Sequence, residues 1–153
     1  RHSGLATGRG FELPQSVIAT GLADFVLVDD AAISRAATEL AHRAHTLAEG
    51  MGAELVLLLI PTKEEVYAAW STEALGEDMI AYLVEGRMAL LEQCAQREWR
   101  CVDATDTFVA AVNEGQTVYN AFDFHLDASG NRLAAELLGR YLIEQGLLAA
   151  GGE

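Results

Sequence analysis

The amino-acid sequence predicts an α/β fold, a three-layer sandwich in which helices cover both faces of a parallel sheet. Short apolar runs alternate with longer segments of helical periodicity, in the order strand, helix, strand, helix, strand, helix, and this alternation is typical of parallel sheets. Residues 54–60 are continuously apolar after Glu54, as expected for a central strand covered on both faces. A chain of 153 residues, 51% of them hydrophobic, suits a single core.

The amino-terminal third contains a lead-in, a first strand and a first helix. Residues 1–24 hold four glycines and a proline without sustained periodicity, so we expect an irregular lead-in with at most a short helix at 16–20. Residues 25–30, FVLVDD, are an apolar run ended by acids, which predicts a strand. Apolar residues then recur at helical spacing and predict a helix that Asp30 caps and that ends near Gly50.

The remaining elements continue the alternation, so residues 25–148 are expected to form one domain. Pro61 ends the central strand, and an apolar stripe predicts a helix at 78–98. RCVDAT, residues 100–105, predicts a shorter strand, and residues 106–115 predict a short helix ended by glycine. The last helix follows Asp127, which can accept hydrogen bonds from its first turn. Its apolar face consists of Leu133, Ala134, Leu137, Leu138, Tyr141 and Leu142.

The charge of the chain limits its partners. With 23 acidic and 10 basic side chains, the formal net charge is −13, which would repel phosphate backbones and anionic lipids. We therefore expect no nucleic-acid partner. The longest apolar run, residues 55–61, is far shorter than the roughly 20 residues that span a bilayer. No signal-peptide pattern opens the chain, so we expect a soluble domain without a membrane segment.

Two cysteines, Cys94 and Cys101, are too few for a zinc site and lack the CxxC spacing of redox centres. Free cysteine is commonly buried, which favours one buried thiol on a helix and another on a strand. A disulfide between the two is the alternative, and it would imply an oxidising compartment.

Asp123 and His125 are the main candidates for chemistry. Ligands of parallel sheets sit beyond the carboxyl ends of the strands, and the segment before His125 is expected near that edge. In a nucleophilic hydrolase, a histidine takes the proton from a serine hydroxyl while a carboxylate orients the imidazole. Two positions apart in an extended segment, the side chains start on the same side. Turn and cap chemistry explains the pair as well, so both interpretations remain open.

Three other side chains are weaker candidates. Lys63 follows the central strand and is placed to contact an anionic substrate, although Glu64 and Glu65 beside it also suit a solvated turn. His42 and His45 have an i, i+3 spacing that can hold a metal ion. No third ligand stands in a recognisable pattern, so two histidines on a polar helix face are favoured and no metal is predicted.

Three segments, in the same order, resemble the SGNH (GDSL-type) hydrolase superfamily. DFHLDASGNRLAAELL, residues 123–138, resembles its last block, in which Asp and His precede a glycine and an Ala/Leu-rich closing helix. LVLLLIPTKEEVYAAW, residues 55–70, and CVDATDTFVAAVNEGQTVYNAFDFH, residues 101–125, are similar to bacterial branches that include polysaccharide O-acetyltransferase-like proteins. The resemblance spans about residues 25–145. It implies a flavodoxin-like SGNH fold, of which this chain would form the carboxyl-terminal part.

The resemblance implies that His125 is a general base and Asp123 its orienting carboxylate. It implies a Ser–His–Asp mechanism on an ester or an acylated carbohydrate, without a metal or organic cofactor. The usual spacing in the family is Asp-x-x-His, whereas this chain has Asp-x-His, as some branches do. No Gly-Asp-Ser block with a nucleophile occurs in the 153 residues. We therefore expect a fragment, or a permuted or degenerate relative, that is hydrolytically inactive alone.

Further expectations concern an alternative function, partners and location. A non-catalytic domain that binds a glycan or a partner protein is the alternative to an ester-processing enzyme. A partial sheet would leave a strand edge exposed, through which the chain could associate with another copy. Exported branches of the family suggest the periplasm or the cell surface.

Overall fold

A pair of parallel strands lies at the centre of the fold. In the computed structural model, which describes residues 30–149, β1 (Val56–Leu59) pairs with β2 (Arg100–Asp103). The register places Val56 opposite Arg100 and Leu59 opposite Asp103. Because the strands are parallel, the chain leaves both of them at the same edge of the pair.

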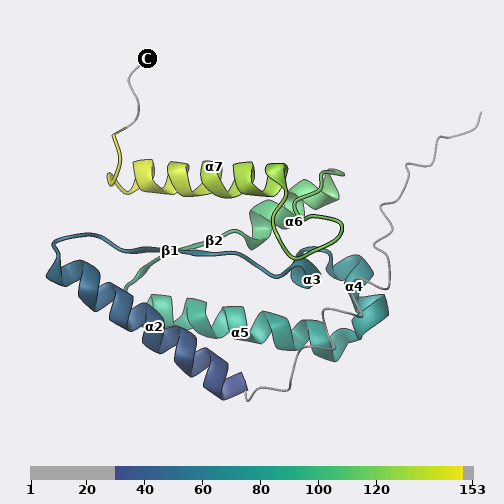
Figure 1. The fold of residues 1–153 in the computed structure, drawn as a ribbon, viewed down its shortest axis with the longest axis horizontal. Helices are drawn as coiled ribbons and strands as arrows, with labels where there is room; N and C mark the ends of the chain where they lie inside the picture. Colours follow the sequence, from purple (N-terminus) through teal and green to yellow (C-terminus); the bar gives the residue numbers. More distant parts are fainter. Residues whose placement is uncertain (1–29, 150–153) are drawn as a thin grey trace, which may run out of the picture.

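Helices lie on both sides of the strands. In Figure 1, α2 and α5 are on one side, and α6 and α7 are on the other. α2 packs on α5, and α6 packs on α7. Among the described helices, none combines the length and the apolar character that crossing a membrane requires. The bounds are α2 (Asp30–Gly50), α3 (Lys63–Val66), α4 (Ala68–Leu75), α5 (Glu77–Gln96), α6 (Thr105–Asn113) and α7 (Ala128–Glu144).

The alternation of helices with parallel strands agrees with the predicted α/β class. The described residues contain two strands, so the full three-layer sandwich stays a prediction. β1 is less covered than a central strand should be, since Leu59 is its one fully buried residue. Each strand has one edge without a partner in residues 30–149, and self-association through such an edge also stays a prediction.

Most predicted boundaries agree with the structure to within a few residues. α5, β2, α6 and α7 occupy the segments in which sequence periodicity and turn signals place them. The lead-in at 1–24 and the predicted strand at 25–30 lie outside the described residues, except for Asp30. α2 starts at Asp30, and the role of Asp30 as its cap stays a prediction. Leu40 and Leu47, from the predicted apolar stripe of α2, are exposed.

The segment directly after β1 is helical and not the expected turn. The hydroxyl of Thr62 accepts from the N–H of Glu65, and the Glu65 carboxylate accepts from the N–H of Thr62. This reciprocal capping satisfies N–H groups that the first turn of a helix leaves free. The chain then passes through Tyr67 into α4. A solvated turn is wrong for this segment, because Lys63 and Glu65 are both buried.

The main apolar core lies between α3, α6 and α7. Phe108 is fully enclosed and meets the ring of Tyr119 edge-on, with ring centroids 6.3 Å apart. The other buried members are Val66, Tyr67, Ala104, Ala111, Val112, Val118 and Ala134, and Leu58, Leu126, Leu133 and Leu137 pack against them. The core therefore includes both the helix that follows β1 and the segment that joins α6 to α7.

Cys94 and Cys101 form a disulfide that ties the end of α5 to β2. Their Cα atoms are 6.2 Å apart, within the usual range for such a bridge. The interpretation as two free thiols is therefore wrong, and the alternative, a disulfide between the two cysteines, is confirmed. Trp99, inside the short loop that the disulfide closes, is buried, and the Arg97 guanidinium lies 5.2 Å from its ring centroid.

Candidate acid–base site

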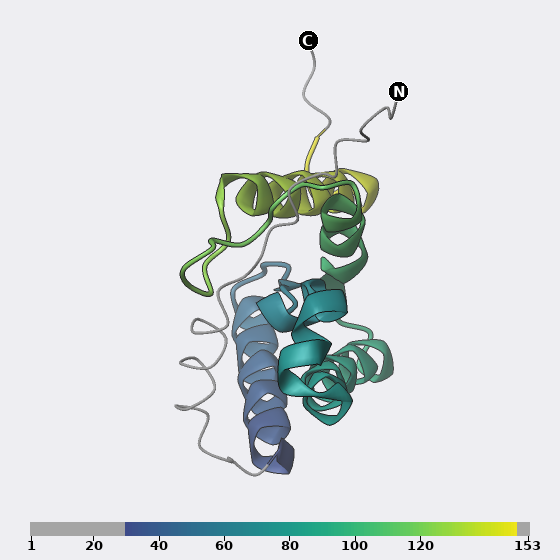
Figure 2. The same ribbon diagram turned by 90° about the vertical axis from the view of Figure 1, so that its right-hand side faces the viewer.

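The loop between α6 and α7 carries Asp123 and His125. Tyr119 and Leu126 form an antiparallel bridge at its base, and the N–H of Asn120 donates to the carbonyl of His125 over 2.9 Å. Figure 2 shows this green loop projecting to one side of the helices. We refer to residues 119–126 as the 119–126 loop.

One carboxylate oxygen of Asp123 makes two contacts with His125. Oδ1 accepts from the backbone N–H of His125 at 2.9 Å and lies 3.3 Å from Nδ1 of the imidazole. The backbone hydrogen bond is the main cause that holds the pKa of Asp123 below its ordinary value, and the imidazole and Lys63 add to it. The His125 side chain is 86% exposed. Turn chemistry and a carboxylate–imidazole contact therefore occur together, and the catalytic roles stay predictions.

Asp127 and Gly130 join the loop to α7. Asp127 is the N-cap that the sequence predicts, since its Oδ1 accepts from the N–H of Gly130 at 2.8 Å. Its N–H donates to the carbonyl of Val118. That carbonyl packs against Gly130, where an added Cβ would lie 2.1 Å from the oxygen. The close approach excludes any side chain and explains the glycine in DASGNR.

Lys63 is buried against the same loop. Lys63 is 6% exposed. Its Nζ donates to three carbonyl oxygens, those of Asn120 at 2.5 Å, Asp123 at 3.1 Å and Ala121 at 3.4 Å. Burial lowers the pKa of Lys63, and the nearby carboxylates of Glu64 and Asp123 partly oppose that shift. A contact between Lys63 and a substrate anion stays a prediction.

Two tyrosines hold the base of the loop. The hydroxyl of Tyr67 accepts from the N–H of Val118 at 3.1 Å, and the hydroxyl of Tyr119 donates to the carbonyl of Pro61. Burial raises the pKa of Tyr119 above its ordinary range. PTKEEVY and DFHLDASGN, which are about 60 positions apart in the sequence, therefore form one structural unit.

An ion-pair network connects the ends of the two strands beside this unit. Arg87 of α5 donates through Nε to Glu65 at 2.9 Å and through Nη1 to Asp103 at 2.5 Å. Asp103 also accepts from the N–H and the hydroxyl of Thr105, and so contacts the first turn of α6. Sequence reasoning missed Arg87. The Thr62-x-x-Glu65 spacing of a capping box was the available signal for Glu65.

Two exposed aromatic residues flank the acidic residue of the pair. Phe122 is 80% exposed and Phe124 is 52% exposed. Their position in FDFH was the signal in the sequence, and sequence reasoning did not use it. The tip of the 119–126 loop therefore presents apolar rings on either side of Asp123.

The two histidines of α2 pack against Trp99, away from the 119–126 loop. His42 and His45 of α2 contact the ring of Trp99, with centroids 6.3 Å and 5.8 Å apart. In residues 30–149, no group of three His, Cys, Asp or Glu side chains gathers in a way that could hold a metal ion. The expectation of two plain polar-face histidines is thus incomplete, because the rings pack on an aromatic partner.

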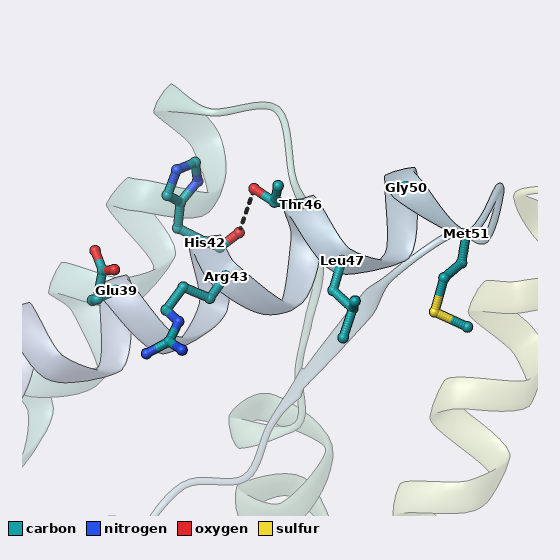
Figure 3. A pocket seen from close by; sticks show the side chains of 7 residues that line it. All are labelled: Glu39, His42, Arg43, Thr46, Leu47, Gly50 and Met51. Atoms are coloured by element: carbon teal, nitrogen blue, oxygen red, sulfur yellow. Dashed lines mark hydrogen bonds between the residues drawn. The ribbon is translucent and has the colours of Figure 1, made fainter.

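An open hollow of about 630 Å³ lies along α2, and Figure 3 shows its lining side chains. The hydroxyl of Thr46 donates to the carbonyl of His42 there over 3.0 Å. The lining residues are Glu39, His42, Arg43, Thr46, Leu47, Gly50 and Met51. Neither the 119–126 loop nor Lys63 contributes to it, so this hollow is separate from the candidate acid–base pair.

Residues 23–153 match a family model described as the SGNH hydrolase-like domain of the acetyltransferase AlgX. No curated protein and no solved structure matches the chain. The matched region contains both strands, the 119–126 loop and α7.

Proposed function

Because this chain belongs to the SGNH hydrolase-like domain family of the acetyltransferase AlgX, we propose that it supplies the acid–base half of an acyl-transfer site. His125 is the general base, and Asp123 is the carboxylate that orients it. The acyl donor is an ester, and the acceptor is water or a carbohydrate hydroxyl. The nucleophilic serine lies outside these 153 residues, which contain no Gly-Asp-Ser sequence.

The contact between Asp123 and His125 supports this proposal most strongly. An imidazole that donates its Nδ1 proton to Oδ1 of Asp123, 3.3 Å away, leaves Nε2 unprotonated and able to accept a proton. The 86% exposure of His125 keeps that nitrogen accessible to a serine on another part of the complete domain. The carboxylate also stabilises the imidazolium that forms during the reaction.

The proposed reaction is a double displacement. His125 Nε2 takes the serine hydroxyl proton as Oγ attacks the ester carbonyl carbon, and the departing alkoxide takes that proton when the ester C–O bond breaks. The acyl group is then bound to the serine. In the second half, water or a sugar hydroxyl gives its proton to His125 and attacks the acyl carbonyl, and the serine oxygen recovers the proton on leaving.

The test uses the full-length protein and p-nitrophenyl acetate as acyl donor. We expect His125→Ala to lower kcat by about 10³-fold or more, and Asp123→Asn by up to about 10⁴-fold. His42→Ala is the matched control, because this histidine lies on α2 against Trp99, and it should keep wild-type kcat. Wild-type kcat in His125→Ala would contradict the proposal and favour a non-catalytic domain that binds a glycan or a protein.

We also place the domain in an oxidising compartment, the periplasm or the cell surface. The disulfide between Cys94 and Cys101 supports this location, because disulfides persist in exported proteins and are rare in the cytosol. Labelling of intact cells with a maleimide, before and after reduction, tests it. Both cysteines should react with the maleimide only after the disulfide has been reduced.

A further inference from the structure

Lys63 is the single lysine of the chain, and it is buried where the chain leaves β1. An ammonium group withdrawn from water destabilises a protein unless hydrogen bonds replace its hydration. The groups that replace the hydration of the Lys63 ammonium must therefore come from elsewhere in the fold.

The three N–H donors of Lys63 are matched by three acceptors from one stretch of the 119–126 loop. The acceptors are the carbonyl oxygens of Asn120, Ala121 and Asp123, at 2.5, 3.4 and 3.1 Å. Three carbonyl dipoles that converge on one point repel one another, and the positive charge between them turns that repulsion into attraction. The backbone of the loop is thus wrapped around the ammonium.

The contact at Asp123 connects this arrangement to the acid–base pair. The carbonyl of Asp123 faces Lys63, while its carboxylate accepts from the N–H of His125 and lies beside the imidazole. The carbonyl of His125 in turn accepts from the N–H of Asn120, the residue that makes the shortest contact with Lys63. A shift of the backbone at Asn120 or Asp123 would therefore move the imidazole.

We propose that Lys63 is a positioning residue whose ammonium holds the 119–126 loop in the shape that brings Asp123 and His125 together. This inference rests on the proposed function only for its catalytic consequence. Its structural part concerns the isolated chain. In this role, Lys63 acts through the backbone of the loop, as an alternative to the predicted contact with a substrate anion.

Hydrogen exchange on the isolated chain tests the structural part without any enzymatic activity. In Lys63→Met, the amides of Asn120 and His125 should lose protection by about tenfold or more, because three carbonyls of the loop lose their common donor. The amides of β1, β2 and α7 should keep theirs. Arg132→Met, which removes an exposed charge on α7, is the matched control. Unchanged loop amides, or loss of protection throughout the chain, would overturn the proposal.

The wild-type protein provides a second measurement that needs no variant. Because the chain has one lysine, lysine labelled with ¹⁵N gives a single side-chain signal. We expect its ammonium protons to exchange slowly and acetic anhydride to modify Lys63 at least about tenfold more slowly than free lysine. Modification at the rate of free lysine would overturn the proposal.

The catalytic consequence is measured in the full-length enzyme. Lys63→Met should lower kcat and leave KM within about twofold, since a positioning residue contributes to the reacting geometry and not to substrate binding. A raised KM with unchanged kcat would show that Lys63 contacts the substrate and would overturn the positioning role. If His125→Ala kept wild-type kcat, the proposed function would fail while the hydrogen-exchange result remained valid.

Discussion

Oδ1 of Asp123 lies 2.9 Å from the backbone nitrogen of His125 and 3.3 Å from Nδ1 of its ring. A single carboxylate oxygen therefore both closes a turn and faces the imidazole. The two contacts have separable consequences, because replacing the imidazole removes the second and leaves the first.

The first prediction concerns the titration of Asp123. Its pKa lies below the ordinary aspartate value of about 3.9, chiefly because of the backbone N–H of His125. Since the folded pKa is depressed, these contacts stabilise the loop above the ordinary value and are lost as pH falls through the folded pKa. In ¹³C NMR titrations, His125→Ala should raise the pKa of Asp123 while leaving it below the ordinary value. An ordinary value in the wild type would contradict the turn geometry.

The second prediction concerns the packing of α7 on the segment before the loop. Gly130→Ala should lower the free energy of unfolding by about 3 kcal/mol, because its Cβ would meet the Val118 carbonyl oxygen at 2.1 Å. Gly139→Ala, in the same helix and with open space around it, should raise that free energy by up to about 1 kcal/mol. Urea denaturation measures both. Equal effects of the two substitutions would contradict the close approach.

The third prediction concerns the buried carboxylate of Glu65. Arg87→Met should lower the free energy of unfolding by about 3–5 kcal/mol, because it leaves a side chain that is 3% exposed without its cation. Arg132→Met breaks a pair with Glu136 in which both side chains are more than half exposed, so its effect should stay below about 1 kcal/mol. Thermal denaturation of the two variants checks the contrast, and similar losses would argue against a buried network.

The fourth prediction concerns the disulfide. It closes a loop between positions seven apart, so replacing both Cys94 and Cys101 by alanine should lower the free energy of unfolding by about 2 kcal/mol. A reducing agent should have a similar effect on the wild type and none on the double variant. Stability that is insensitive to reduction in the wild type would contradict the bridge.

The fifth prediction concerns the isolated chain. Without a nucleophile block among its 153 residues, it should hydrolyse p-nitrophenyl acetate no faster than its own His125→Ala variant. Robust hydrolysis by the isolated chain that His125→Ala abolishes would show that the catalytic site is complete within these residues.

Local sequence signals predicted a large part of this structure. Periodicity placed α5 and α7, and the position of Asp127 before an apolar helix identified the cap, because both depend on residues a few positions apart. The contact between Lys63 and the 119–126 loop joins residues about 60 positions apart, and no periodicity reports such a distance. Because that contact is invisible locally, the neighbouring Glu64 and Glu65 suggested that Lys63 lies in a solvated turn.

Two other features also depend on tertiary contacts that local sequence signals do not reveal. Arg87 is a helix residue like many others in the sequence, and its role depends on Glu65 and Asp103 arriving from two different strand ends. The cysteine pairing depends on how closely the end of α5 approaches β2. Neither tertiary arrangement has a local signature, whereas the capping box at Thr62 did and was overlooked.

The distance between Nε2 of His125 and the Oγ of the nucleophilic serine, in a crystal structure of the full-length protein, tests the acid–base proposal most directly. We predict a hydrogen bond of about 2.6–3.2 Å, with Asp123 on the opposite side of the imidazole. A serine served by a different base, with His125 too far away to reach it even through one water molecule, about 6 Å or more, would contradict the proposal.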